Sequence, residues 1–155
     1  MRVKKQIVLF WLFLSSFQVL SAGEECSFDP AFFSEKTYRA FKQVRDVYWL
    51  PETQEARIIL NSGDVLMIKH WSCNHFGLDA VLISSQEAED ILEKINQLAS
   101  IVLDKHDRAS LQQVLKEKPP SQIKRLDVPS EYSEFFVSII KFDNYQTIRI
   151  KYYRD

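Results

Sequence analysis

Glycine is scarce in this sequence, whose 155 residues include only Gly23, Gly63 and Gly77. A dinucleotide-binding fingerprint and a Walker-type phosphate loop both need clustered glycines where the backbone meets a phosphate. Because these three glycines lie far apart, the sequence contains neither motif. It also lacks the Gly-x-Ser-x-Gly pattern that marks the nucleophile elbow of the α/β-hydrolases.

An excess of charge of either sign is missing as well. The formal net charge is −1 and the pI is near 6.3, so the sequence gives no electrostatic reason to expect a nucleic-acid partner. Hydrophobic residues make up 46% of the chain and charged residues 26%, which allows one packed domain. No pair of acidic residues stands out for catalysis. We therefore predict no catalytic residues, no cofactor and no metal.

The first 22 residues have the features of a secretory signal. A positively charged start precedes an unbroken apolar run at residues 7–14, and small residues lead up to Ala22. The apolar run is shorter than the roughly 20 residues that a membrane-spanning helix needs. We expect cleavage after Ala22, which leaves residues 23–155 as a single periplasmic or secreted domain with no stable membrane insertion. An uncleaved N-terminal anchor is the alternative.

The sequence has two cysteines, Cys26 and Cys73, and both follow the predicted signal. An even number of cysteines in an exported chain favours a disulfide bond between them. The alternative is a thiol- or metal-dependent enzyme, because His70 and His75 flank Cys73 closely enough to activate a thiolate or to help hold zinc. The second cysteine and the absence of a further Cys or His pair favour the disulfide.

Two groups of β-strands are predicted. Segments 56–60, 65–71 and 78–83 are rich in β-branched residues and form a three-stranded antiparallel meander. The turn at residues 72–77 is expected to use a positive φ angle at Gly77.

Residues 135–142 and 147–153 form a C-terminal hairpin. Its alternation predicts that Ile148, Ile150 and Tyr152 face the core, whereas Arg149, Lys151 and Tyr153 face outward. Lys69 and Trp71 would share that outward face if their strand lies nearby.

Three helices are expected. The strongest amphipathic pattern covers residues 84–104, with Ser84 and Glu87 as a capping box. A shorter helix follows at 107–118 with Asp107 as its cap, and another is expected at 31–47. Residues 121–130 form a polar connector.

Together these elements predict an α+β domain. It has an antiparallel sheet of about five strands, one long amphipathic helix and one or two shorter helices packed on that sheet.

The functional expectation is a non-enzymatic exported binding protein that neutralises a protein partner in the cell envelope, as an inhibitor or an immunity protein does. This rests on a general profile of size, export and missing catalytic motifs. A small-molecule or glycan-binding envelope domain is the alternative from another class. Turn and outward strand positions supply the predicted partner-binding residues, which are Asn74, His75, Phe76, Arg149, Lys151 and Tyr153.

Overall fold

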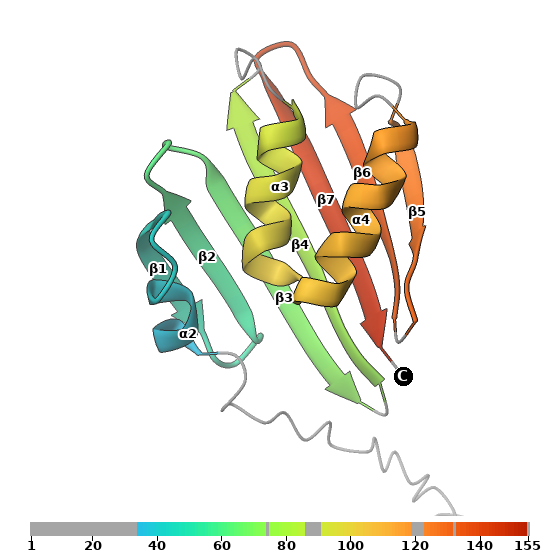
Figure 1. Cartoon of the computed structure of the whole chain (residues 1–155). Helices are drawn as coiled ribbons and strands as arrows, with labels where there is room; N and C mark the ends of the chain where they lie inside the picture. The colour runs from blue at the N-terminus through green and yellow to red at the C-terminus, as the bar shows by residue number, and fades with distance from the viewer. Residues whose placement is uncertain (1–33, 74, 86–90, 119–122, 132, 155) are drawn as a thin grey trace, which may run out of the picture.

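The computed structural model describes residues 34–73, 75–85, 91–118, 123–131 and 133–154 (Figure 1). In chain order the described elements are α2 (Glu35–Arg39), β1 (Val44–Leu50), β2 (Glu55–Leu60), β3 (Val65–Cys73), β4 (His75–Ser85), α3 (Ile91–Val102), α4 (Lys105–Glu117), β5 (Arg125–Pro129), β6 (Glu134–Lys141) and β7 (Tyr145–Arg154). The strands form one seven-stranded antiparallel sheet in the order β1-β2-β3-β4-β7-β6-β5. The predicted α+β class is confirmed.

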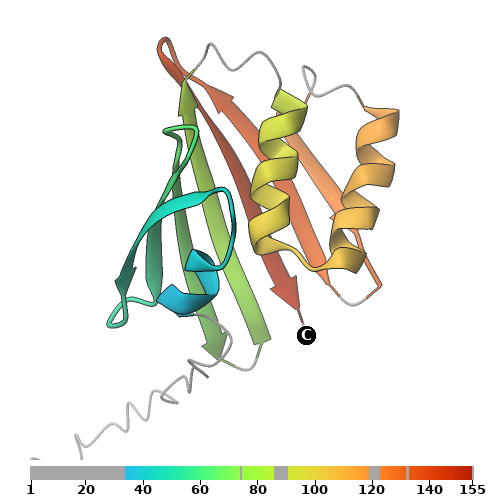
Figure 2. The same ribbon diagram turned by 60° about the vertical axis from the view of Figure 1, so that its left-hand side comes forward.

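Helices α3 and α4 lie side by side on one face of this sheet, as the two views in Figures 1 and 2 show. The short helix α2 lies against β1 on the same side. We call this the inner face and the opposite face the outer face. None of the described helices packs on the outer face.

The inner face carries the hydrophobic core because the strands alternate. Every second residue points towards the helices, and Ile58, Leu66, Leu82 and Ile148 are completely buried there. Helix α3 meets them with one buried side of its own, formed by Ile95, Leu98, Ala99 and Ile101. The buried side chains of the strands and of α3 therefore pack together in one hydrophobic core.

The predicted three-stranded meander and the predicted C-terminal hairpin are both confirmed. Strand β2 pairs with β3, β3 with β4, and β6 with β7, all antiparallel. Ile148, Ile150 and Tyr152 are buried, whereas Arg149, Lys151 and Tyr153 lie on the outer face as predicted.

The predicted helix at residues 31–47 is wrong over its second half. Helix α2 ends at Arg39, and β1 begins at Val44 and pairs with β2. The apolar spacing that resembles a helix includes Val44, which belongs to the strand. In β1 the buried Val47 is followed by the exposed Tyr48, which is the two-residue period of a half-buried strand.

A second strand was missed in the predicted connector at residues 121–130. Strand β5 pairs with β6, and its alternation buries Leu126 and Val128. Pro129 is its last residue, a position that an edge strand tolerates because no ladder partner needs a donor there. The sheet consequently has seven strands where about five were expected.

The predicted helix caps and the Gly77 turn also need correction. Ser84 pairs with Gln146 as part of β4, so it does not begin a helix. Asp104 caps α4 by accepting a hydrogen bond from the backbone N–H of Asp107, at 2.9 Å. Gly77 lies within β4, and Gly63 is the described glycine with a positive φ, at 88°.

The predicted signal peptide and Cys26 lie outside the described residues, as do Asn74 and Glu87. Cys73 is the last residue of β3, but its side chain is not described. The disulfide and the cleavage site therefore stay predictions. Within the described ranges, no helix has the length and apolar character needed to cross a bilayer.

Candidate functional site

The outer face brings residues from distant parts of the sequence together at the centre of the sheet. Strand β7 lies between β4 and β6, and β3 lies on the far side of β4. The register places Tyr153 opposite Gly77, and Gly77 opposite Trp71. Trp71, Lys151 and Tyr153 thereby become neighbours, and we call them the aromatic–basic cluster.

In this cluster the two aromatic rings contact each other, and the ammonium group of Lys151 lies near both of them. The ring centroids of Trp71 and Tyr153 are 5.6 Å apart, with one ring edge-on to the other. The Nζ atom of Lys151 lies 5.3 Å from the Tyr153 centroid and 6.0 Å from the Trp71 centroid. Such a geometry holds the ammonium group at the surface by its attraction to the ring faces. The cluster therefore presents a cation and two aromatic rings to the solvent.

Gly77 makes room for this cluster. A Cβ atom at position 77 would collide with the indole ring of Trp71, which lies across the glycine. The bare backbone of β4 thus serves as the floor on which the Trp71 ring rests. This close approach, and not a positive φ angle, explains why glycine stands here.

Arg149 lies beside the cluster, but Asp79 holds its guanidinium. Its Nε donates to Asp79 Oδ1 at 2.7 Å, and its second nitrogen bonds the other carboxylate oxygen. This hydrogen bonding to Asp79 raises the pKa of Arg149 further above its ordinary value. The Arg149 side chain is therefore paired within its own sheet, whereas the Nζ atom of Lys151 lies near two rings and forms no ion pair among the described residues.

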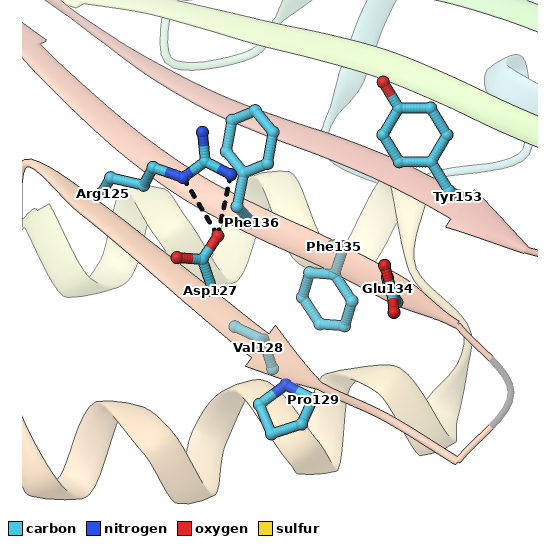
Figure 3. A pocket seen from close by; sticks show the side chains of 8 residues that line it. All are labelled: Arg125, Asp127, Val128, Pro129, Glu134, Phe135, Phe136 and Tyr153. Atoms are coloured by element: carbon cyan, nitrogen blue, oxygen red, sulfur yellow. Dashed lines mark hydrogen bonds and ion pairs between the residues drawn. The ribbon is translucent and has the colours of Figure 1, made fainter.

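A groove of about 570 Å³ lies next to the cluster, over β5, β6 and β7 (Figure 3). The Arg125 guanidinium sits 4.0 Å from the centroid of the Phe136 ring and forms an ion pair with Asp127 at 2.9 Å. The groove's exposed walls are formed by Arg125, Asp127, Pro129, Glu134, Phe136 and Tyr153. Tyr153 belongs to both features, so the groove and the cluster form one continuous surface.

The other end of the outer face is aliphatic. Cross-strand neighbours there form a row of β-branched side chains, Ile59, Val65, Ile83, Thr147 and Ile140. Met67 lies beside this row in a hollow of about 260 Å³, and its side chain is 41% exposed. Ile140 is 56% exposed. An apolar surface on an uncovered sheet is a feature of contact sites more than of ordinary solvated faces.

The predicted partner-binding residues do not all share this surface. Arg149, Lys151 and Tyr153 do. Phe76 faces the inner side, where its ring lies 6.4 Å from that of His70 and 6.1 Å from that of Tyr152. Asn74 is outside the described residues, and of His75 only the backbone is described, at the start of β4.

The sequence analysis missed five groove residues, which are Arg125, Asp127, Pro129, Glu134 and Phe136. The alternation of buried and exposed residues in Arg125–Pro129 is visible in the sequence and could have indicated a strand. The pairing of that strand with β6 could not have been read from the pattern. Without it, nothing places Arg125 over Phe136.

Buried polar groups elsewhere connect the helices to the sheet. The carboxylate of Asp107, a residue only 2% exposed, accepts hydrogen bonds from the hydroxyls of Ser130 at 2.6 Å and Ser133 at 2.7 Å. Burial, and then the hydrogen bond to Asp107, raises the pKa of Tyr152 to about 12. This network connects α4 to β7 and to the residues between β5 and β6.

A buried tyrosine–histidine pair lies under α2. The hydroxyl of Tyr38 is hydrogen-bonded to Nε2 of His70, which is 2% exposed, and Trp49 packs beside both rings. Burial lowers the pKa of His70 to about 4. His70 therefore points into the core, away from the outer face. Among the described residues, no group of three or more His, Cys, Asp and Glu side chains could hold a metal ion.

Comparison of the chain with models of protein families, with curated proteins and with solved structures gives no match.

Proposed function

We propose that this chain is an exported binding protein that holds a protein partner against the outer face of its sheet, in the manner of an inhibitor or an immunity protein. The observation that carries the proposal is the outer face, on which none of the described helices packs and where the aromatic–basic cluster, the groove and the aliphatic row form one surface across the strands. Export rests on the predicted signal at residues 1–22.

The composition of this surface favours a protein partner over a small ligand. Aromatic and arginine side chains contribute most of the binding energy in protein interfaces, and Trp71, Tyr153 and Phe136 supply such anchors here. Both hollows are open and lie on a broad sheet, whereas small-molecule sites enclose most of their ligand. Lys151 is placed to meet an acidic group of the partner because its ammonium group forms no ion pair among the described residues.

A glycan ligand is the second candidate, and the aromatic–basic cluster favours it. Exposed rings such as those of Trp71 and Tyr153 can stack on sugars, and the bare backbone at Gly77 leaves Trp71 flat against the sheet. The two functions differ in how much of the outer face they use. A glycan would need the cluster alone, whereas a protein would also cover Met67 and Ile140.

The test is affinity capture from an envelope extract, followed by titration calorimetry with the purified captured protein. We expect Lys151→Ala combined with Tyr153→Ala to weaken binding by more than about 2 kcal/mol. Met67→Glu, on the aliphatic part, is also expected to weaken it. Gln113→Ala combined with Lys116→Ala, on the exposed side of α4, is the matched control and should leave the affinity unchanged.

Three results would contradict the proposal. Equal affinity in the outer-face and α4 variants would place the partner elsewhere. Binding of a glycan that depends on Trp71 and Tyr153 but not on Met67 would favour the second candidate. If neither a protein nor a glycan that depends on these residues is recovered, both candidate functions are contradicted.

A further inference from the structure

The two edges of the sheet differ in how their backbone groups are satisfied. At the β1 edge, the carboxylate of Asp46 accepts a hydrogen bond from the backbone N–H of Val47 at 2.8 Å. The guanidinium of Arg39 in α2 donates to the carbonyl oxygen of Val47 at 3.1 Å. The register also shifts between Val44 and Asp46. Side chains and a bulge thus block this edge against a further strand.

The β5 edge has no such protection from the described residues. The backbone N–H of Ile139 donates to the carbonyl of Lys124 at 3.2 Å, which defines Lys124 and Ile139 as a hydrogen-bonded pair. Because such pairs alternate in an antiparallel ladder, Leu126 and Val128 also direct their backbone groups towards β6. Arg125 and Asp127 then direct theirs away from the sheet. Figure 1 shows β5 at the rim, with no described element beyond it.

We propose that β5 pairs with β5 of a second copy of this chain, which would join the two sheets edge to edge. The proposal goes beyond the partner-binding function and does not depend on it. A two-fold axis at Leu126 places Arg125 of each copy opposite Asp127 of the other. Each of these residue pairs then exchanges backbone hydrogen bonds, because both members direct their N–H and C=O groups outward.

Charge selects this register over its neighbours. Backbone hydrogen bonds between the two β5 strands form only where a residue whose backbone groups point away from β6 lies opposite another such residue. The two neighbouring registers that meet this condition place Arg125 opposite Arg125 or Asp127 opposite Asp127. Both bring like charges together across the strands, which is destabilising. The register centred on Leu126 instead gives two reciprocal Arg–Asp pairs on the outer face. Pro129, which lacks a backbone donor, limits the pairing at the end of the strand.

The dimer would also change the shape of the candidate site. Arg125, Asp127 and Pro129 form the edge wall of the groove, as Figure 3 shows. Across the two-fold axis the walls of two grooves meet, so the two outer faces become one extended surface. A partner longer than one groove could then contact both copies.

The test is analytical ultracentrifugation of the purified exported chain over concentrations up to about 1 mM, since a short edge contact gives a weak dimer. We expect a reversible dimer that is not disulfide-linked on a non-reducing denaturing gel. Asp127→Pro removes the outward N–H without touching the β6 ladder. It should raise the dissociation constant at least roughly tenfold above that of Asp127→Ala, which loses the same carboxylate but keeps the N–H.

A charge exchange provides a second variant if Asp127→Pro fails to fold, as judged by circular dichroism. Arg125→Asp alone should weaken the dimer, and the double variant Arg125→Asp with Asp127→Arg should restore it. A wild-type chain that stays monomeric at every concentration would overturn the proposal. So would a dimer that responds neither to Asp127→Pro relative to Asp127→Ala nor to the charge exchange.

Discussion

The indole ring of Trp71 on β3 lies across the backbone of Gly77 on β4, and no side chain larger than hydrogen fits beneath it. The same ring packs edge-on with Tyr153 on β7. Three strands therefore contribute to one surface feature, and its geometry depends on a glycine that no turn requires.

Gly77→Ala should displace the Trp71 ring and disturb the aromatic–basic cluster. We expect a loss of about 1–3 kcal/mol in the free energy of unfolding, because the added methyl group forces the ring to move. The measurement is denaturant unfolding together with Trp71 fluorescence in a Trp49→Phe background. Gly63→Ala is the control, since φ is 88° there and nothing lies within 4 Å of the added Cβ. It should cost about 1 kcal/mol without changing Trp71 fluorescence, and an unchanged emission spectrum in Gly77→Ala would contradict the argument.

Asp107 and Asp104 are both acidic residues near the start of α4, yet they should differ in their contribution to stability. Asp107→Ala leaves the hydroxyls of Ser130 and Ser133 without their buried acceptor, and we expect a loss of about 3 kcal/mol. Asp104→Ala removes an exposed cap, which is worth about 1 kcal/mol, and a solvent-exposed ion pair with Arg154 that adds little. Chemical denaturation of both variants measures the two losses. Equal losses would show that the buried network does not fix α4 to the sheet.

The sequence predicts the fold correctly where half-buried strands alternate apolar and polar residues and where turn-forming residues separate them. Residues 56–60, 65–71, 135–142 and 147–153 alternate because one face of the sheet meets the helices and the other meets solvent. Strand β1 could not be found in the same way, because Tyr38, Phe41 and Val44 also fit a helical period across the boundary between α2 and β1. Local pattern alone does not reveal the pairing with β2 that decides the outcome.

The same limit applies to the candidate site. Alternation predicts that Arg149, Lys151 and Tyr153 share one face, and they do. It does not say that β7 lies between β4 and β6, so the neighbours Trp71 and Phe136 could be placed only by the register. Phe76 shows the reverse problem. Its place within the predicted turn at residues 72–77 suggested exposure, whereas its ring packs against His70 and Tyr152.

The bridge between Cys26 and Cys73 remains a prediction with a direct test. Peptide mapping under non-reducing conditions should recover the two cysteines in one linked fragment. Replacing either cysteine by serine should cost about 2–5 kcal/mol, because the bridge would connect the N-terminal segment to the end of β3. The double replacement is the control and should resemble each single variant. Alkylation of both thiols in the unreduced, denatured protein would contradict the bridge.

His70 should make the domain less stable in mild acid. Burial lowers its pKa to about 4 in the folded chain, from 6.5 for an unperturbed histidine. Between these values the unfolded chain binds the proton and the folded chain does not, so the free energy of unfolding falls as pH falls from about 6.5 to about 4. The loss is about 3 kcal/mol over that window and levels off below it.

Tyr38 offers no compensation for a charge on His70, because burial raises the pKa of Tyr38 and keeps its hydroxyl neutral. Denaturant unfolding of the wild type and of His70→Phe at several pH values isolates the effect, since every other titrating group is common to both. The wild type should lose stability through the window more steeply than the variant. Tyr38→Phe, which keeps the histidine buried, should retain the steep profile. If the wild type and His70→Phe give parallel profiles between pH 6.5 and pH 4, His70 is not buried in its neutral form.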